Sequence, residues 1–237
     1  MAVPVLNETE ARKRRAAERA ADFVESGMRV GLGTGSTARH VVDVLAERLR
    51  SGELRDIVGV PTSRATEEHA RASSIPLATL DAQPRLDLTI DGADEFDPRL
   101  DLIKGLGGAL LWEKIVASVS QRFVIVADES KEVDRLGTRA PVPVEVVPFG
   151  WRTHLEPFEA LGARPVLRSS ATRVPFVTDS GHYIIDLHFR DGIADAAALD
   201  HALRERPGVV ATGLFLNQVD TVLIASAAGV RVRERAA

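Results

Sequence analysis

The 237-residue sequence contains no cysteine. This absence excludes disulfide bonds, thiolate zinc sites and cysteine nucleophiles, and it suits a reducing compartment such as the cytosol. The sequence also lacks any apolar run near the ~18 residues that span a bilayer, and no signal-peptide pattern precedes Asn7. We therefore expect a cytoplasmic protein with no membrane partner.

An excess of charge of one sign is also missing. The 30 Lys and Arg and 34 Asp and Glu residues are intermixed and give a net charge of −4, so no basic face of the kind that nucleic acids require is expected. The arginine-rich stretch 11–23 includes glutamate and aspartate and is typical of a helix with a solvated face. These features predict that nucleic acid is not a partner.

Strand-like and helix-like segments alternate over the first 130 residues or so. A helix over 7–27 is predicted, with Asn7 as its N-cap, and a second after residue 35, with Ala38, Val41, Val42, Leu45 and Leu49 on one apolar face. Short β-branched runs predict buried strands at 28–33, 56–60, 86–90 and 122–127. The order indicates a Rossmann-like parallel sheet with crossover helices.

The pattern changes near Gly137. Residues 137–150 are rich in proline, which central strands tolerate poorly, so we interpret them as a domain crossing. A helix (151–162), three strands (163–169, 174–180 and 182–189) and a helix (195–208) follow, and the runs 208–215 and 221–229 are expected to return to the first sheet. The predicted fold is α/β, with a Rossmann-like domain over 1–136 and 213–237 and a smaller α+β domain over 137–212, inserted before the C-terminal strands.

The segment "GLGTGSTARH", residues 31–40, is a candidate anion site. It is not a dinucleotide fingerprint, because Ser36 stands where the third glycine belongs, and no Gly-Lys-Ser/Thr follows to make a P-loop. Ser36 and Thr37 lie where a strand feeds a helix, so their hydroxyls and the first N–H groups of the helix can hold an anion such as phosphate. The alternative is that one of them is simply an N-cap.

Two further motifs carry charged residues. In "LTIDGADEFD" an apolar strand ends in Asp91, Gly92, Ala93 and Asp94, where parallel sheets form their ligand crevice. A capped turn is the alternative; a divalent metal is disfavoured, because the EF-hand spacing does not match and no histidine pair supports it.

In "LIKGLGGALLWEKIVASV", Lys104 precedes a glycine-rich turn and Glu113 lies in a helix whose apolar neighbours, Ile115 among them, imply burial. A carboxylate near a buried face must pair, form hydrogen bonds or have a raised pKa, although Glu113 could also bridge to a lysine on the helix surface.

A fourth segment, "VIVADESK", ends a strand in Asp128 and places Lys131 one turn further on; taken singly, this lysine is a solvated one. Together, the four segments predict a phosphate grip beside an acid/base cluster at four strand ends of one sheet, without a cofactor loop. This set suits proton abstraction next to a sugar carbonyl, with a carboxylate base and a lysine that stabilises the enediolate.

The motifs "GLGTGSTA", "DGADEFD", "KGLGGALLWEK" and "VIVADESKEVDRLG", in this order and spacing, resemble type A ribose-5-phosphate isomerase, as do "VPVEVVPFG" and "PGVVATGLF". The resemblance implies an aldose–ketose isomerase of the pentose phosphate pathway, which interconverts ribose 5-phosphate and ribulose 5-phosphate without metal or other cofactor. It also implies a two-domain α/β fold and a homodimer or tetramer.

The same resemblance implies roles for individual residues. Glu113 is the proton acceptor, Asp91 assists ring opening, and Lys104, oriented by Asp94, holds the enediolate together with backbone N–H groups. The implied substrate-binding residues are Thr34, Gly35, Ser36, Thr37, Asp91, Gly92, Ala93, Asp94, Lys104, Gly105, Leu106, Gly107 and Lys131, with Lys13 as an additional phosphate ligand. Trp112 stands where many members of the family carry arginine, and we expect it to be a core or interface residue.

Two other functions share this type of sheet. One is a sugar-phosphate sensor domain, which would bind without turnover, and the other is an amino-sugar-phosphate deaminase, which would release ammonia. The sequence lacks a DNA-binding segment, which argues against a complete regulator.

Overall fold

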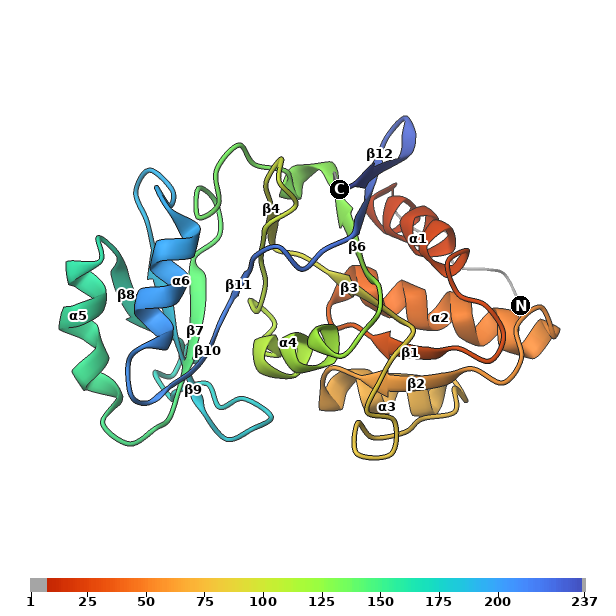
Figure 1. The fold of residues 1–237 in the computed structure, drawn as a ribbon, viewed down its shortest axis with the longest axis horizontal. Coiled ribbons are helices and arrows are strands. Elements are labelled where there is room, and N and C mark those ends of the chain that lie inside the picture. The colour runs from red at the N-terminus through yellow and green to blue at the C-terminus, as the bar shows by residue number, and fades with distance from the viewer. Residues whose placement is uncertain (1–7, 236–237) are drawn as a thin grey trace. The chain divides into compact units, whose positions relative to one another are not determined.

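The structure is a computed structural model that describes residues 8–235, so the predicted N-cap Asn7 lies outside the described residues. The chain forms two compact units (Figure 1). The first comprises the residues up to Gly92, Val116–Ser130 and those from Val219 onward, and the second comprises Ala93–Ile115 and Lys131–Gln218. The predicted boundaries, 137 and 212, stay a prediction; in the structure residues 93–115 group with the second unit because their two strands pair there.

The first unit contains a six-stranded sheet in the order β13-β12-β6-β3-β1-β2. Its strands are β1 (Arg29–Leu32), β2 (Val58–Pro61), β3 (Leu88–Gly92), β6 (Phe123–Asp128), β12 (Thr221–Ser226) and β13 (Gly229–Glu234). All neighbours pair in parallel except β12 and β13, which form an antiparallel hairpin. The predicted parallel sheet with crossover helices is confirmed.

Three helices bury one face of this sheet: α1 (Glu8–Ala21), α2 (Ser36–Ser51) and α3 (Arg64–Ala72). In α2 the predicted apolar face is buried, with Leu49 only partly covered, because residues three and four apart share one side of a helix. The second half of α4 (Leu110–Ser118) lies on the opposite face, where Val116 packs with Val60 and Leu86.

The strand order creates a topological switch point between β1 and β3. The chain leaves β1 toward β2 on one side and later returns to β3 on the other. At such a point the loops that follow the two strands diverge and leave a crevice at their carboxyl ends. In this chain those loops are the glycine loop after β1 and the Asp91–Gly92 turn at the end of β3.

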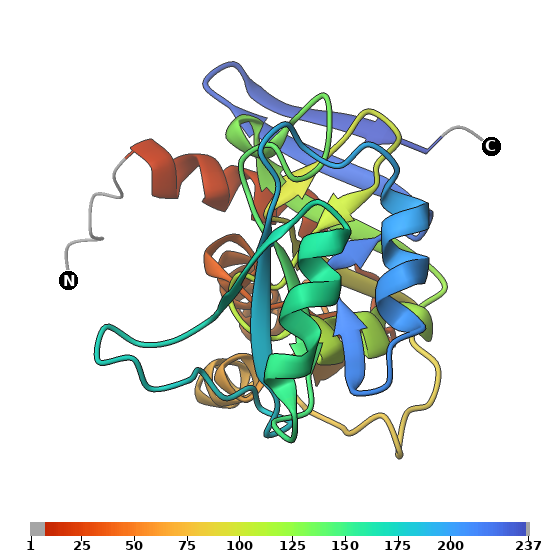
Figure 2. The same cartoon turned by 90° about the vertical axis from the view of Figure 1, so that its left-hand side faces the viewer.

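The second unit contains a four-stranded antiparallel sheet, β10-β7-β9-β8, formed by Val209–Thr212, Val142–Val146, Tyr183–His188 and Arg164–Leu167. Helices α5 (Leu155–Ala160) and α6 (Ala196–Arg204) cover one of its faces, as Figure 2 shows. Two short 3₁₀ helices, η1 (Glu129–Lys131) and η2 (Trp151–His154), complete the helical elements. The predicted smaller α+β domain is therefore present.

A separate three-stranded sheet, β11-β5-β4, also belongs to the second unit. It is built from Leu214–Phe215, Leu102–Ile103 and Glu95–Phe96. Lys104 and the glycine turn follow β5, so the prediction that all four candidate segments end strands of one sheet is wrong. Only the segments after β1, β3 and β6 do so, and these strands are neighbours. Two-residue strands are too short for a sequence pattern to reveal.

Two other predictions of strands are wrong. Within 174–180 only Pro175 forms a bridge, with Ser169, because proline has no N–H for a ladder and the preceding residues form a turn closed by Ser170 N and Val174 O. The run 208–215 does not return to the first sheet: β10 pairs with β7, and β11 pairs with β5. The run 221–229 does return, as β12.

The proline-rich segment contains a central strand. Pro143 lies in β7 between β9 and β10, and its carbonyl accepts a hydrogen bond from Gly213 N, 2.7 Å away, just beyond the last residue of β10. In an antiparallel pair the N–H and C=O of one residue face the same neighbouring strand. The N–H that Pro143 lacks would therefore face β10, at the end of the β7–β10 ladder, where a missing hydrogen bond costs least.

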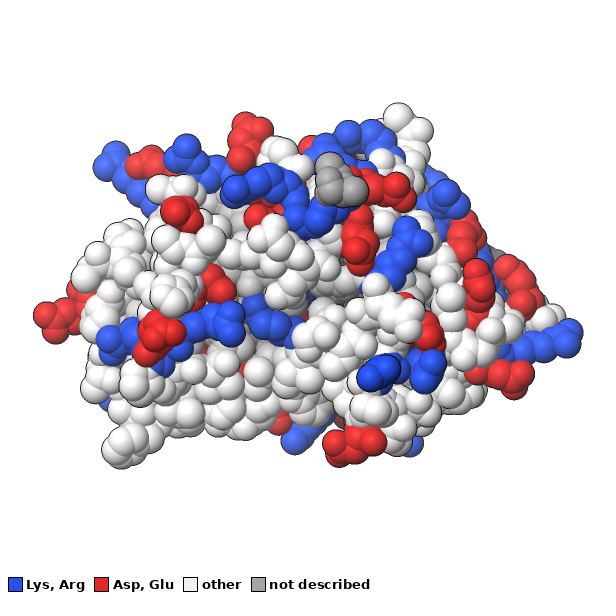
Figure 3. Space-filling model, in the orientation of Figure 1, with Lys and Arg blue, Asp and Glu red and all other residues white. Residues whose placement is uncertain are grey.

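Charges of both signs alternate over the face drawn in Figure 3, in keeping with the mixed composition. Within residues 8–235, no helix is long and apolar enough to cross a bilayer.

Candidate active site

The glycine loop after β1 begins α2 without a side-chain cap. Gly35, with φ of +109°, is the N-cap residue, and no side chain accepts a hydrogen bond there. The interpretation of Ser36 or Thr37 as the N-cap is therefore wrong. Ser36 is exposed, and its hydroxyl stands with the first N–H groups of α2, which have no partner within a helix. The end of α2 is thus open to an anion.

Asp91 joins this loop to the end of β3. Its side chain is fully buried, and Oδ1 accepts hydrogen bonds from Thr34 N (3.0 Å) and Gly92 N (2.7 Å). A Cβ atom on Gly33 would lie 2.3 Å from the same oxygen. Glycine is therefore required at position 33, because any larger residue would push the loop away from the carboxylate.

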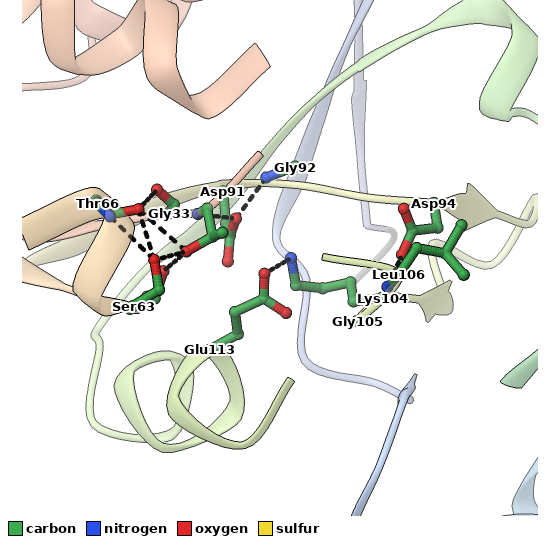
Figure 4. A network of polar contacts seen from close by, with 12 residues as sticks. Gly33, Ser63, Thr66, Asp91, Gly92, Asp94, Lys104, Gly105, Leu106 and Glu113 are labelled. Carbon is green, nitrogen blue, oxygen red and sulfur yellow. Dashed lines mark hydrogen bonds and ion pairs between the residues drawn. The ribbon is translucent and has the colours of Figure 1, made fainter. Parts of the chain in front are cut away.

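A cluster of hydroxyls lies behind the loop, shown on the left of Figure 4. Thr34 Oγ1 lies 2.8 Å from both Thr62 Oγ1 and Ser63 Oγ, and 3.1 Å from Thr66 Oγ1. Thr62 and Ser63 follow β2, the neighbour of β1, and Ser63 caps α3 by accepting from Thr66 N. These residues were not predicted from the sequence, although "PTSRAT", a strand end followed by a Ser cap, indicates them.

In the second unit, Lys104 and Glu113 form a buried ion pair (Figure 4). Lys104 Nζ lies 3.3 Å from Glu113 Oε1, and the two residues are 2% and 4% exposed. Lys104 follows β5 and Glu113 lies in the first turn of α4. Of the two readings of Glu113, the structure favours a buried partner over a lysine on the helix surface. Ile115, expected to be buried, is 44% exposed.

The turn between them, residues 105–108, depends on glycine. Gly105 and Gly108 have φ of +102° and +83°, and Gly108 N donates to Gly105 O at 3.0 Å. Asp94 fixes the turn from outside, since its Oδ2 accepts from Leu106 N at 2.9 Å. The structure therefore places Asp94 on the backbone of the turn after Lys104, and its predicted role in orienting the lysine stays a prediction.

The predicted phosphate ligands lie on different elements. Lys131 ends η1, directly after β6, and is partly exposed. Lys13 lies on α1 and pairs with Glu10, whose carboxylate also contacts His40 of α2. Trp112 donates its Nε1–H to Ser180 Oγ at 2.9 Å within the second unit. Its expected role as a core or interface residue stays a prediction.

Lys114, the residue after Glu113, is an ionisable group that the sequence analysis did not consider. Its Nζ donates to Leu214 O and lies 4.2 Å from the centroid of the Phe215 ring, which Lys104 Nζ also approaches, at 5.6 Å. Burial lowers the pKa of Lys114 from 10.5 to about 8, against the opposing effect of the Asp200 charge. A cationic side chain in this place costs folding free energy.

We predict that this cost makes stability depend on pH. Below about pH 8 Lys114 is charged in both the folded and the unfolded state, so the cost is fully present. Between about pH 8 and pH 10.5 only the unfolded chain keeps the proton, so the free energy of unfolding rises. Lys114→Met should remove that rise, which is about 3 kcal/mol, as measured by urea unfolding at several pH values. A parallel pH dependence in variant and wild type would contradict the assignment.

These features define a class of protein: an α/β enzyme with a helix N-terminus that lacks a side-chain cap at a sheet switch point in one unit, and a buried lysine–carboxylate pair in the other. The comparisons give the particular family. Residues 58–229 match the profile of ribose 5-phosphate isomerase A (phosphoriboisomerase A). A curated relative, ribose-5-phosphate isomerase A of Roseiflexus castenholzii, is 56% identical over 92% of this chain and 93% of its own length. The probable ribose-5-phosphate isomerase 2 of Arabidopsis thaliana is 47% identical over 94% of this chain and 86% of its own.

Solved structures agree. A D-ribose-5-phosphate isomerase determined in complex with phospho-erythronic acid is 40% identical and superimposes with a TM-score of 0.92 over 95% of this chain and 99% of its own. The ribose 5-phosphate isomerase of Plasmodium falciparum is 38% identical, with a TM-score of 0.93 over 96% of this chain and 100% of its own. The chain belongs to the ribose 5-phosphate isomerase A family.

Proposed function

We propose that the protein interconverts D-ribose 5-phosphate and D-ribulose 5-phosphate through an enediolate. The observation that carries the proposal is the buried Lys104–Glu113 pair, which supplies a base and a positive charge 3.3 Å apart in a chain of this family. A carboxylate held next to a cation in a water-poor place can take a weakly acidic C–H proton while the cation balances the charge that develops.

The reaction begins with opening of the furanose ring, which Asp91 assists. Glu113 then removes the proton from C2 of the aldehyde and returns it to C1, while the hydroxyl proton passes from O2 to O1. Lys104 and nearby backbone N–H groups stabilise the enediolate oxygens, and Asp94 holds that backbone by accepting the Leu106 N–H. The contacts of the two aspartates support this proposed division of roles: Asp91 binds the glycine loop, and Asp94 binds the turn after Lys104.

The phosphate is held by the start of α2, by Thr34, Gly35, Ser36 and Thr37, and by Lys131. The helix N-terminus offers N–H groups and the positive end of the helix dipole, and Lys131 adds a full charge. The turn Gly92–Ala93 carries the chain from Asp91 to Asp94 and completes the substrate-binding set.

We predict that Lys131→Ala raises KM for ribose 5-phosphate about tenfold or more and leaves kcat within about threefold, because a cation opposite the phosphate is lost. Steady-state kinetics over a range of substrate concentrations measures both constants. Arg190→Ala, the loss of another exposed cation, is the control and should change neither. A fall in kcat alone would show that Lys131 is not a phosphate ligand.

The function itself is tested by adding ribose 5-phosphate to purified protein in EDTA and following ketose formation. Full activity is expected, since the proposed mechanism uses no metal or other cofactor. Binding without turnover would instead favour a sensor domain, and ammonia release from an amino-sugar phosphate would favour a deaminase.

The homodimer or tetramer expected from the resemblance is tested by light scattering, and the cytoplasmic location by fractionation.

A further inference from the structure

Arg168 connects the small antiparallel sheet to the turn between Lys104 and Glu113. It follows β8 directly, and its side chain is 14% exposed. Nε donates to Asp186 Oδ2 at 2.9 Å and Nη2 contacts the other carboxylate oxygen, which fixes the plane of the guanidinium. Nη1 then donates to two backbone carbonyls, Gly105 O at 2.9 Å and Leu106 O at 3.0 Å.

These contacts fix two successive peptide planes. The plane that joins Gly105 to Leu106 is held at both ends, because Arg168 binds its carbonyl and Asp94 binds its N–H. The plane that joins Leu106 to Gly107 is held at its carbonyl. No described peptide bond is cis, and in a trans peptide the C=O and N–H point in opposite directions, so the Gly107 N–H points away from Arg168.

The Gly107 N–H donates to no acceptor among residues 8–235. Gly108 N–H, by contrast, is already used inside the turn, on Gly105 O. A donor fixed in direction and without an internal partner, three residues from Lys104, suits a negative oxygen that forms during a reaction.

We propose that Arg168 is a positioning residue for the isomerisation: by holding the Leu106 carbonyl it aims the Gly107 N–H at an enediolate oxygen. The inference rests on the proposed function. Glycine loops lose much conformational freedom on ordering, and residues 105–108 contain three glycines. Arg168 and Asp94 supply that order from outside the turn, so the donor does not have to be oriented during the reaction.

The test is Arg168→Ala, measured with ribose 5-phosphate as the substrate and phospho-erythronic acid as an inhibitor. Loss of an oriented oxyanion donor is expected to lower kcat for ribose 5-phosphate about 10²-fold and to leave KM within about threefold. Phospho-erythronic acid carries a carboxylate that mimics the charge of the enediolate, so its inhibition constant should rise in proportion to the fall in kcat/KM. Added guanidinium should restore part of kcat, because it can occupy the vacated place between Asp186 and the two carbonyls.

Arg164→Ala is the matched control, since Arg164 is an exposed arginine on β8, the strand that Arg168 follows, and its kinetics should equal those of the wild type. Asp186→Asn is a second variant that keeps Arg168 but weakens its orientation, and a smaller fall in kcat is expected. The inference would be overturned if folded Arg168→Ala kept the wild-type kcat. It would also be overturned if kcat fell but added guanidinium did not restore it and the inhibition constant of phospho-erythronic acid did not rise with the fall. A wild-type protein without isomerase activity would overturn the proposed function itself.

Discussion

Glu113→Gln is expected to reduce kcat for ribose 5-phosphate by at least about 10²-fold, while the affinity for the sugar phosphate stays within a few-fold. Glutamine keeps the volume and the hydrogen-bonding reach of the side chain but cannot accept the C2 proton. The substitution also removes the negative partner of Lys104, 3.3 Å away, without creating a cavity. Turnover and product inhibition together measure the two effects.

Exchange with solvent deuterium separates this step from the others. If Glu113 removes the C2 proton, the variant should not incorporate deuterium into bound sugar, even over long incubation. Glu159→Gln, an exposed glutamate on α5, is the matched control and should behave as the wild type. Near wild-type turnover in Glu113→Gln would show that the residue is a structural helix acid, and Asp91 or Asp94 would then be the base.

The sequence predicts those parts of the fold whose signal is local and periodic. The apolar face of α2, from Ala38 to Leu45, is an example of a periodic signal, and the β-branched runs that form β1, β3 and β6 are local signals, since these strands are buried along almost their whole length. The alternation of Val and Arg in β13 is also a local pattern typical of a strand, but this strand was not predicted. Such patterns do not indicate which strands pair, because β10 and β12 have similar apolar sequences but pair with strands of different sheets.

In the candidate site, too, the single residues could be predicted from local sequence, whereas the contacts between them could not. Asp91, Lys104 and Glu113 could be selected because charge beside an apolar run is unusual and because their motifs resemble a family. The pairing of Lys104 with Glu113 depends on the left-handed conformations of Gly105 and Gly108, which turn β5 back into α4. No pattern within either element contains that information.

Contacts between distant segments were beyond prediction for a similar reason. The hydroxyls of Thr62, Ser63 and Thr66 meet Thr34 because β2 lies next to β1. Arg168 reaches a turn 62 residues earlier in the chain, where it holds Leu106 O. Both arrangements join segments that are far apart in the chain, and no local sequence pattern indicates such contacts.

Lys104→Met is expected to have the second largest effect, on stability as well as activity. It leaves the buried carboxylate of Glu113 without its cation, and breaking a buried pair in this way costs about 3–5 kcal/mol. Urea unfolding measures this loss. In the same variant kcat should fall by at least about 10²-fold, because the charge that balances the enediolate is gone.

The double variant, Lys104→Met with Glu113→Gln, tests both explanations in one cycle. Once both charges are removed, neither position holds an uncompensated ion, so most of the lost stability should return, while kcat stays at the level of the single variants or below. Recovery of stability without activity means that the pair exists for chemistry, since neutral residues hold the fold equally well. Equal destabilisation in the single and double variants would contradict this view, because the cost would then come from lost packing rather than from an uncompensated charge.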